Sequence, residues 1–518
     1  MAGALEKGKT MLPRLETSDT IDTEVGNGSL SNVSAAEYAE YQELKEVFVG
    51  SRLQKLVHKI DFHVLPQLVL IYLLSYIDRS NAGNAKLFGA LEDLGISGQQ
   101  WNTALAVFFI TYSAGGIPAM IALKRWGPKL WLPILLTSVG VVLVCSGLQH
   151  NMGGWTAFRI ILGLVEAGIF PGCSFVLTAW YSPDELHSRM TLFYSGASLA
   201  GAFSGLLAYA IGQLDGTWGY HGWRFIYVIE GTLSVVVGLL AFIFVYPSPE
   251  NVKSWLSDDE RRFLVLRHKF SAGGESAIGE KEEFDWKYAR QAFKSMHIYA
   301  IALMEFTLCV VVYGASFILP TVIANLGYSA ARAQAMTVPP YAFACIVTVA
   351  SGFLADRYQK RMLSVLLPNL LAALGFVIIL ASVHNKHATG VTLWGVFFVV
   401  GGLYPISPAV TAWISLNTAG SMKRAVSIGS MIAFSQLGGI MGSNIYIANE
   451  SPYYPVGFGL SLGMLLAFGV IWPPFYMLIL KRINARRAAM SEADIRDKYT
   501  AEQLAEMGDE SPLFKYVY

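Results

Sequence analysis

About twelve long apolar stretches run through most of this chain, and they limit what it can fold into. A helix needs about 20 consecutive apolar residues to cross the hydrocarbon core of a bilayer. The whole chain of 518 residues is 54% hydrophobic and only 14% charged, whereas soluble domains carry about 25% charged residues. The sequence therefore predicts an all-α membrane protein with twelve transmembrane helices. The predicted spans are 62–84, 101–123, 130–149, 155–181, 188–213, 223–246, 297–320, 333–355, 363–383, 391–416, 424–447 and 456–480.

One long polar segment separates the sixth predicted span from the seventh, so the spans fall into two six-helix bundles. The sequence preceding the first span is polar, and it lacks the basic and apolar regions of a signal peptide. We expect disorder up to about residue 35 and an amphipathic surface helix over 36–60. The predicted units are an N-terminal tail (1–60), a first bundle (61–246), a central loop (247–295), a second bundle (296–481) and a C-terminal tail (482–518).

Basic residues collect in alternate loops and set the orientation in the membrane, because cytoplasmic loops are enriched in Lys and Arg. They follow the second, eighth, tenth and twelfth spans, and they include Lys124, Arg125, Lys129, Arg357, Lys360, Arg361, Lys423, Arg424, Lys481 and Arg482. We therefore expect both tails and the central loop to be cytoplasmic. The plasma membrane is the expected location, with the vacuole as the alternative.

Charged residues inside two predicted spans indicate a polar site within the bundle. Asp78 and Arg79 are adjacent in the first span, and Arg159 and Glu166 lie two helical turns apart in the fourth. Ionised groups in lipid cost about 2.5–3.5 kcal/mol or more, so they face a cavity or each other. The alternative is that the first span ends near Ile77 and that its charged pair only caps the helix at the interface.

Polar residues of the second half are candidates for the rest of this site. Aromatic residues on membrane helices more often serve packing or anchor the helix at the interface. Tyr313 and Gln436 are nevertheless favoured, because each lies well inside its span. Glu230, in the sixth span of the first half, is expected to form a structural hydrogen bond with a neighbouring helix. Glu305 is either a substrate-specific feature or the partner of an interfacial group. The weaker candidates are Tyr341 and Asn417.

Glycines in the fifth and eleventh predicted spans favour close contact between helices. Such contacts suit helices that slide during a conformational change, and they suit static packing equally well. The residues are Gly196, Gly201, Gly205, Gly429, Gly438, Gly439 and Gly442.

The loop after the eighth span reads "GFLADRYQKR". It resembles the loop signature of the major facilitator superfamily, a glycine, three residues, Asp-Arg and then basic residues. At the corresponding place in the first half, Lys124 stands where the signature has Asp. The resemblance implies the major facilitator fold, whose two halves are related by an axis along the membrane normal. Asp356 and Arg357 are expected to form an inner gate.

Further phrases are similar to the anion:cation symporters of that superfamily, especially the fungal allantoate and nicotinate permeases. These phrases are "YIDRSNAGNAK", "RIILGLVEAGIFPG", "GWRFIYVIEG" and "WISLNTAGSMKRA". The resemblance implies proton-coupled import of a small organic anion, a carboxylate such as nicotinate, allantoate or pantothenate. It also implies proton-coupling roles for Asp78 and Glu166 and substrate-binding roles for Arg79 and Arg159. A guanidinium suits a carboxylate because it stays charged and donates two parallel hydrogen bonds.

Three other functions compete with import. An exporter of a metabolite or toxin is the main alternative, although the fifth span lacks the Gly-Pro pair usual in drug–proton antiporters of the superfamily. A receptor built on a transporter scaffold is disfavoured because the tails and the central loop resemble no signalling module. An enzyme is disfavoured because no catalytic motif is recognised. The expected partners are the anion, protons and the lipid bilayer. The net charge of +1 argues against a nucleic-acid partner, and the cysteines show no metal-ligand spacing. We expect no metal or cofactor, and a monomer.

Overall fold

The computed structural model describes residues 29–212, 214–271, 286–325, 335–384, 388–447, 450–500, 503–504 and 507–518. Across these ranges, twelve helical segments are long and apolar enough to cross a membrane. This confirms the predicted all-α architecture with twelve transmembrane helices. The segments are Ser51–Lys86, Gly98–Trp126, Pro128–Gly147, Met152–Trp180, Glu185–Ala208, Gly222–Phe244, Met296–Leu319, Val338–Tyr358, Arg361–Ser382, Thr389–Leu416, Lys423–Gly442 and Pro455–Ala488.

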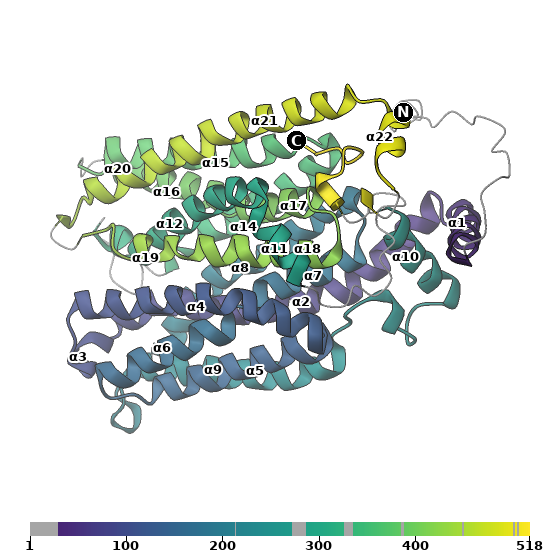
Figure 1. The fold of residues 1–518 in the computed structure, drawn as a ribbon. Helices are drawn as coiled ribbons and strands as arrows, with labels where there is room; N and C mark the ends of the chain where they lie inside the picture. Colours follow the sequence, from purple (N-terminus) through teal and green to yellow (C-terminus); the bar gives the residue numbers. More distant parts are fainter. Residues whose placement is uncertain are drawn as a thin grey trace, which may run out of the picture.

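The transmembrane helices form two halves that lie side by side (Figure 1). The first half contains α2 (Ser51–Leu87), α4 (Gly98–Trp126), α5 (Pro128–Gly147), α6 (Met152–Glu166), α7 (Ile169–Trp180), α8 (Pro183–Gly212) and α9 (Gly222–Phe244). The second half contains α12 (Met296–Asn325), α14 (Val338–Tyr358), α15 (Arg361–Ser382), α16 (Thr389–Leu403), α17 (Ile406–Leu416), α18 (Ser421–Gln436), α19 (Gly438–Gly442), α20 (Pro455–Met464), a π-helical turn (Leu465–Ile471) and α21 (Trp472–Ala488).

The first described helix, α1 (Ser29–Val47), and the C-terminal residues 507–518 lie at the same end of the helix bundle, which we call the termini end (Figure 1). Short helices lie there beside the transmembrane helices: α1 (Ser29–Val47), α10 (Asp258–Ser271) and α22 (Glu492–Lys498). The opposite end, called the far end, carries α3 (Ala90–Leu94). Helix α11 (Trp286–Lys294) precedes the second half. Because α2 starts at the termini end, its residues approach the far end as their numbers rise.

Helix α2 is one unbroken helix from Ser51 to Leu87. The alternative that the first span ends near Ile77 is therefore wrong, and Asp78 and Arg79 lie within the helix. The helix predicted over 36–60 is in fact the end of α1 and the start of α2, because Gly50 adopts a positive φ of 58° between them. Residues 29–35, predicted to be disordered, belong to α1, and the rest of that prediction lies outside the described residues.

Glycines bring helices of the two halves into close contact, as predicted from the sequence. A Cβ added at Gly201 in α8 would lie 2.7 Å from the ring of Tyr341 in α14. One added at Gly439 in α19 would lie 2.5 Å from the ring of Phe109 in α4. Real Cβ atoms do not approach other atoms this closely, so larger residues at these positions would separate the halves. Tyr341, a weaker candidate for the site, therefore serves this packing.

Residues 507–518 fold back onto the second half at the termini end. The Asn417 side chain donates to the Val517 carbonyl at 2.9 Å and accepts from its backbone N–H at 2.7 Å. Lys423 and Asp509 form an ion pair at 2.7 Å, with both side chains at most 3% exposed. Asn417, another weaker candidate for the site, thus holds the C-terminal segment in place.

Candidate functional site

Two buried ion pairs join α2 to α6. Arg79 donates from Nε and Nη2 to Glu166 Oε1, at 3.0 and 2.6 Å. Arg159 donates from Nη1 to Asp78 Oδ2 at 2.9 Å. All four residues are at most 8% exposed. The structure thus brings together the four charged residues predicted from the sequence, and each guanidinium pairs with the carboxylate of the other helix.

Helix geometry explains this crossed pattern. Adjacent residues on a helix point about 100° apart, so Asp78 and Arg79 reach different places on α6. Arg159 and Glu166 share one face of α6 and lie about 10 Å apart along it. The Asp78–Arg159 pair consequently lies nearer the far end, and the Arg79–Glu166 pair lies about two turns deeper.

Arg79 also contacts the second half through a hydrogen-bonded chain. Its Nη1 donates to the hydroxyl of Tyr313 in α12. That hydroxyl donates in turn to Gln436 Oε1, in α18, at 2.9 Å. The two favoured candidates of the second half therefore lie directly beside the charged residues of the first.

Aromatic rings surround both guanidinium groups. The Arg79 Cζ lies 5.0–5.8 Å from the ring centroids of Tyr76, Phe108, Tyr112 and Tyr313. Rings at this distance attract a cation through their π faces.

Arg159 lies 4.5 Å from the Trp155 ring centroid and donates to the Tyr227 hydroxyl at 2.7 Å. Tyr227 lies in the phrase "GWRFIYVIEG", but it was not among the residues predicted for the site. Since buried aromatic residues are common on membrane helices, only the position of Tyr227 opposite Arg159 reveals its contact with the site.

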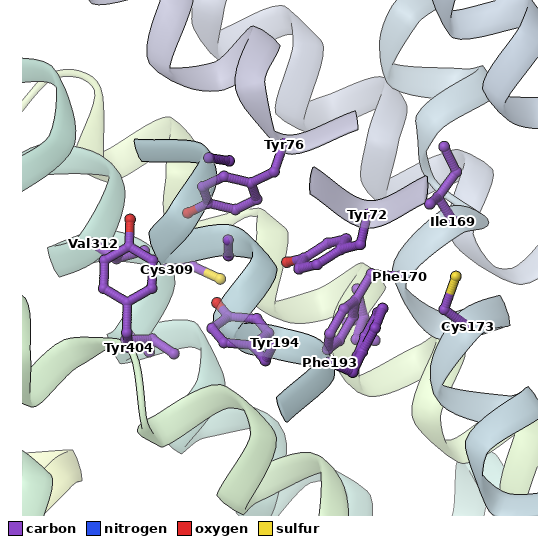
Figure 2. Close-up of a cluster of buried hydrophobic side chains, with 14 of the residues drawn as sticks. Tyr72, Tyr76, Ile169, Phe170, Cys173, Phe193, Tyr194, Cys309, Val312 and Tyr404 are labelled. Atoms are coloured by element: carbon purple, nitrogen blue, oxygen red, sulfur yellow. The ribbon is translucent and has the colours of Figure 1, made fainter. Parts of the chain in front are cut away.

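A small cavity, called the central cavity, lies between the two halves beside Arg79. The centre of a water molecule can move through about 20 Å³ of it, which leaves room for about one water. Figure 2 shows the hydroxyls of Tyr72, Tyr76 and Tyr194 turned toward the interior region beside Cys309. The polar residues that line the cavity are Tyr72, Arg79, Tyr112, Tyr194, Glu305, Tyr313, Ser407 and Gln436.

A second, smaller cavity lies on the other side of Arg79. It is open to a water centre over about 10 Å³, and its lining includes Asp78, Arg159 and Phe317. Arg79 lines both cavities. The guanidinium of Arg79 therefore lies between the central cavity and the Asp78–Arg159 pair.

Two further buried carboxyl groups have partners on neighbouring helices. Asn81 donates to Glu230 in α9, which is the structural hydrogen bond expected for Glu230. Ser407 in α17 donates to Glu305 Oε1 at 2.5 Å. Glu305 therefore lies in the interior beside the central cavity, and the interfacial partner considered for it is wrong.

Three of the membrane spans that carry the site have a local irregularity beside it. Helix α6 ends at Glu166, and α18 ends at Gln436. Tyr404 and Pro405 separate α16 from α17, and Ser407 is the second residue of α17. The residues between the segments keep right-handed helical dihedrals, so each pair of segments forms one membrane span with a local irregularity at the level of the site.

The termini end holds a separate polar cluster between the halves. Asp356 accepts from the backbone N–H of Ser188 in α8 at 2.7 Å and from Arg361 Nη1 at 3.0 Å. Arg361 is fully buried, whereas Arg357 is exposed. Asp356 thus pairs with Arg361 and not with its chain neighbour Arg357, which points about 100° away around the helix. Among the residues placed by the structure, no group of three or more His, Cys, Asp or Glu side chains could hold a metal ion.

The family model of the Major Facilitator Superfamily matches residues 68–443. The chain belongs to the Major Facilitator Superfamily. This major facilitator is 38% identical over 508 residues to the MFS-type transporter cnsO of Penicillium expansum, covering 96% of this chain and 97% of cnsO. It is 29% identical to the high-affinity nicotinic acid transporter of Saccharomyces cerevisiae, covering 90% and 85% of the two chains.

Its fold resembles the proton:xylose symporter XylE bound to 6-bromo-6-deoxy-D-glucose, with a TM-score of 0.59 and 15% identity. The match covers 79% of this major facilitator and 94% of the symporter. This similarity establishes the shared fold. Together with the family match, it shows that the chain is a membrane transporter.

Proposed function

We propose that this protein imports a small organic carboxylate together with protons by alternating access. The crossed, buried ion pairs of α2 and α6 are the observation that carries the proposal. Buried charges are costly unless paired, so each arginine represents a charge held ready within the bilayer. The relative named as a nicotinic acid transporter supports a carboxylate, since nicotinic acid carries one.

Proton binding changes the partners of the arginines in the proposed mechanism. A proton on Asp78 or Glu166 removes the negative charge that holds Arg159 or Arg79. The released guanidinium then binds the carboxylate of the substrate through charge-assisted hydrogen bonds. Proton and anion together leave the total charge of the site unchanged, so the loaded site crosses the bilayer without an additional buried charge.

Orientation and gating complete the proposal. We place the termini end in the cytoplasm because the basic loops lie at that end. Protons and substrate then enter from the far end, where the Asp78–Arg159 pair lies, and reach the Arg79–Glu166 pair next. The Asp356–Arg361 cluster acts as the inner gate, and the plasma membrane is the proposed location.

Replacing Glu166 by Gln tests proton coupling. We expect Glu166→Gln to keep exchange of labelled for unlabelled anion in proteoliposomes and to lose accumulation driven by an external acid gradient. The amide keeps the shape of the side chain and cannot take up a proton. The substrate comes from an uptake screen of small organic anions at two external pH values. Glu260→Gln in α10 is the matched control. Equal loss of exchange and of accumulation in Glu166→Gln would contradict the coupling role.

Uptake by intact cells that express this chain tests the direction of transport. Import predicts label uptake that rises when the external medium is acidified. If deleting the gene instead causes the anion to build up inside the cells, the protein is an exporter.

A further inference from the structure

Glu305 is a buried carboxyl group that the proposed proton and anion sites do not use. Its side chain is 4% exposed, and its Oε1 accepts the Ser407 hydrogen bond. Its Oε2 is buried with no hydrogen-bond partner among the described residues. A buried carboxyl oxygen without a partner costs free energy, so such an atom requires an explanation.

The location of Glu305 distinguishes it from other carboxyl groups that have an unpartnered buried oxygen, such as Glu230. Glu230 also has a buried oxygen, Oε1, without a partner in the described part of the chain. However, Glu230 lines neither the central cavity nor the smaller one, and its other oxygen joins α2 to α9. Glu305 lines the central cavity, so its unpartnered oxygen is available to a molecule bound there.

The lining of the central cavity therefore includes two ionisable side chains of opposite character, and we refer to their places as its Arg79 end and its Glu305 end. Arg79, from the first half, is a hydrogen-bond donor with no acceptor atom. Glu305, from the second half, already acts as an acceptor toward Ser407. Aromatic and apolar side chains, including Tyr72 and Phe170, form the walls of the same cavity.

We propose that the substrate is a carboxylate that carries an N–H or O–H donor at its other end, and that Glu305 accepts this donor. The proposal rests on the proposed function, since Arg79 must bind the carboxylate. A substrate of this class satisfies both ends of the cavity at once. A carboxylate with an apolar end leaves Glu305 Oε2 unpaired and loses the corresponding binding free energy.

Matched pairs of probes test this inference by changing a donor into a methyl group. The first pair is succinamate and 4-oxopentanoate, which differ only in NH₂ against CH₃ beside the same carbonyl. The second pair is 4-aminobenzoate and 4-methylbenzoate. Uptake of each probe is measured in proteoliposomes containing the purified full chain, with an inward acid gradient. We expect the donor member to be taken up at least about tenfold better in one pair or both, because polar sites reject analogues that lack the expected partner.

Two substitutions assign this preference to Glu305. Glu305→Leu removes the acceptor, and Glu305→Gln keeps the shape and an oxygen for Ser407 while presenting an amide N–H. We expect the uptake ratio to fall to about 3 or less in both variants. The control Glu230→Gln is expected to keep the wild-type ratio. Because each ratio is measured within one preparation, it does not depend on the fraction of folded protein.

The outcomes separate this inference from the proposed function. Equal uptake of both members in the wild type, or an unchanged ratio in both variants, overturns the role of Glu305 and leaves carboxylate import intact. Loss of both members in both variants also contradicts the role, since the Arg79 end is intact in each. If the wild type takes up none of the four probes, the result counts against the proposed function and against this inference with it.

Discussion

Arg79 is the residue in which the contacts of both halves meet. It uses Nε and Nη2 for Glu166 and Nη1 for Tyr313. A guanidinium makes these contacts because its five N–H groups are fixed in one plane, whereas an ammonium is a compact charge on a flexible chain. The geometry of the side chain, as well as its charge, is therefore required at this position.

Replacing Arg79 by Lys tests this requirement. We expect uptake of the anion to fall by about tenfold or more, because Lys keeps the charge and cannot contact Glu166 and Tyr313 in the same plane. The measurement is initial uptake in proteoliposomes. Arg357→Lys, at an exposed position, is the matched control and is expected to keep wild-type uptake. An Arg79→Lys protein with normal uptake would show that charge alone is sufficient.

At the scale of elements, short segments outside the bilayer hold the ends of the transmembrane helices. Helix α3 does so at the far end through Asp93, whose Oδ2 accepts from Trp223 Nε1 and Arg224 Nε, both at 2.8 Å. Burial raises the pKa of Asp93, but the hydrogen bonds from Arg224 and Trp223 outweigh it and leave the pKa below its usual value. The ionised form is therefore the stabilising one.

Asp93→Asn should lower stability in a pH-dependent way. A lowered folded-state pKa contributes stability that is present above the unfolded pKa of about 3.9 and is lost as the pH falls through the folded value. We expect the variant to cost about 1 kcal/mol at pH 7, and less near pH 3.5. Thermal unfolding in detergent measures this, with Glu92→Gln on α3 as the exposed control. If the difference in stability between the wild type and Asp93→Asn is as large at pH 3.5 as at pH 7, the ionised form of Asp93 is not the stabilising one.

The C-terminal segment holds the second half at the termini end through the Lys423–Asp509 pair. Lys423→Met leaves Asp509 buried without its partner, so we expect a loss of about 3–5 kcal/mol in the free energy of unfolding. The double variant Lys423→Met/Asp509→Leu should recover most of that loss, because it removes both charges. If the double variant is as unstable as the single one, the pair itself does not stabilise the segment.

The sequence predicts the elements better than it predicts their partners. Apolar length and charge placement were enough to predict the twelve spans and to single out Asp78, Arg79, Arg159 and Glu166. The crossed pairing was not predictable, because it depends on how α2 and α6 are positioned along each other. Tyr227 and Ser407 were missed for a related reason, since aromatic and hydroxyl residues are common in membrane helices and only contacts across helices distinguish them.

At the scale of the whole molecule, the candidate site and the proposed inner gate both lie where the two halves meet. Close packing of α8 against α14 brings Gly352 against Thr191 near the termini end, so that an added Cβ would lie 2.7 Å from the Thr191 Cβ. Packed interfaces of this kind have discrete arrangements rather than continuous ones. We therefore expect this contact to form when the termini end is closed.

Gly352→Ala should hinder that closure. We expect uptake to fall by about tenfold, because the added methyl group separates α8 from α14 and favours the state open at the termini end. Adding Thr191→Ala should restore part of the uptake, since it removes the hydroxyl and methyl groups that face Gly352. Kinetics of uptake for both variants provide the measurement, and an unaffected Gly352→Ala protein would show that this contact does not control the cycle.

The central cavity has room for about one water, so even a small carboxylate does not fit until the two halves move apart. The affinity measured for any solute then includes the free energy of that expansion, which is the same for every solute of similar size. Substitutions that loosen the helix packing far from Arg79 are accordingly expected to tighten apparent binding without adding a single contact to the solute.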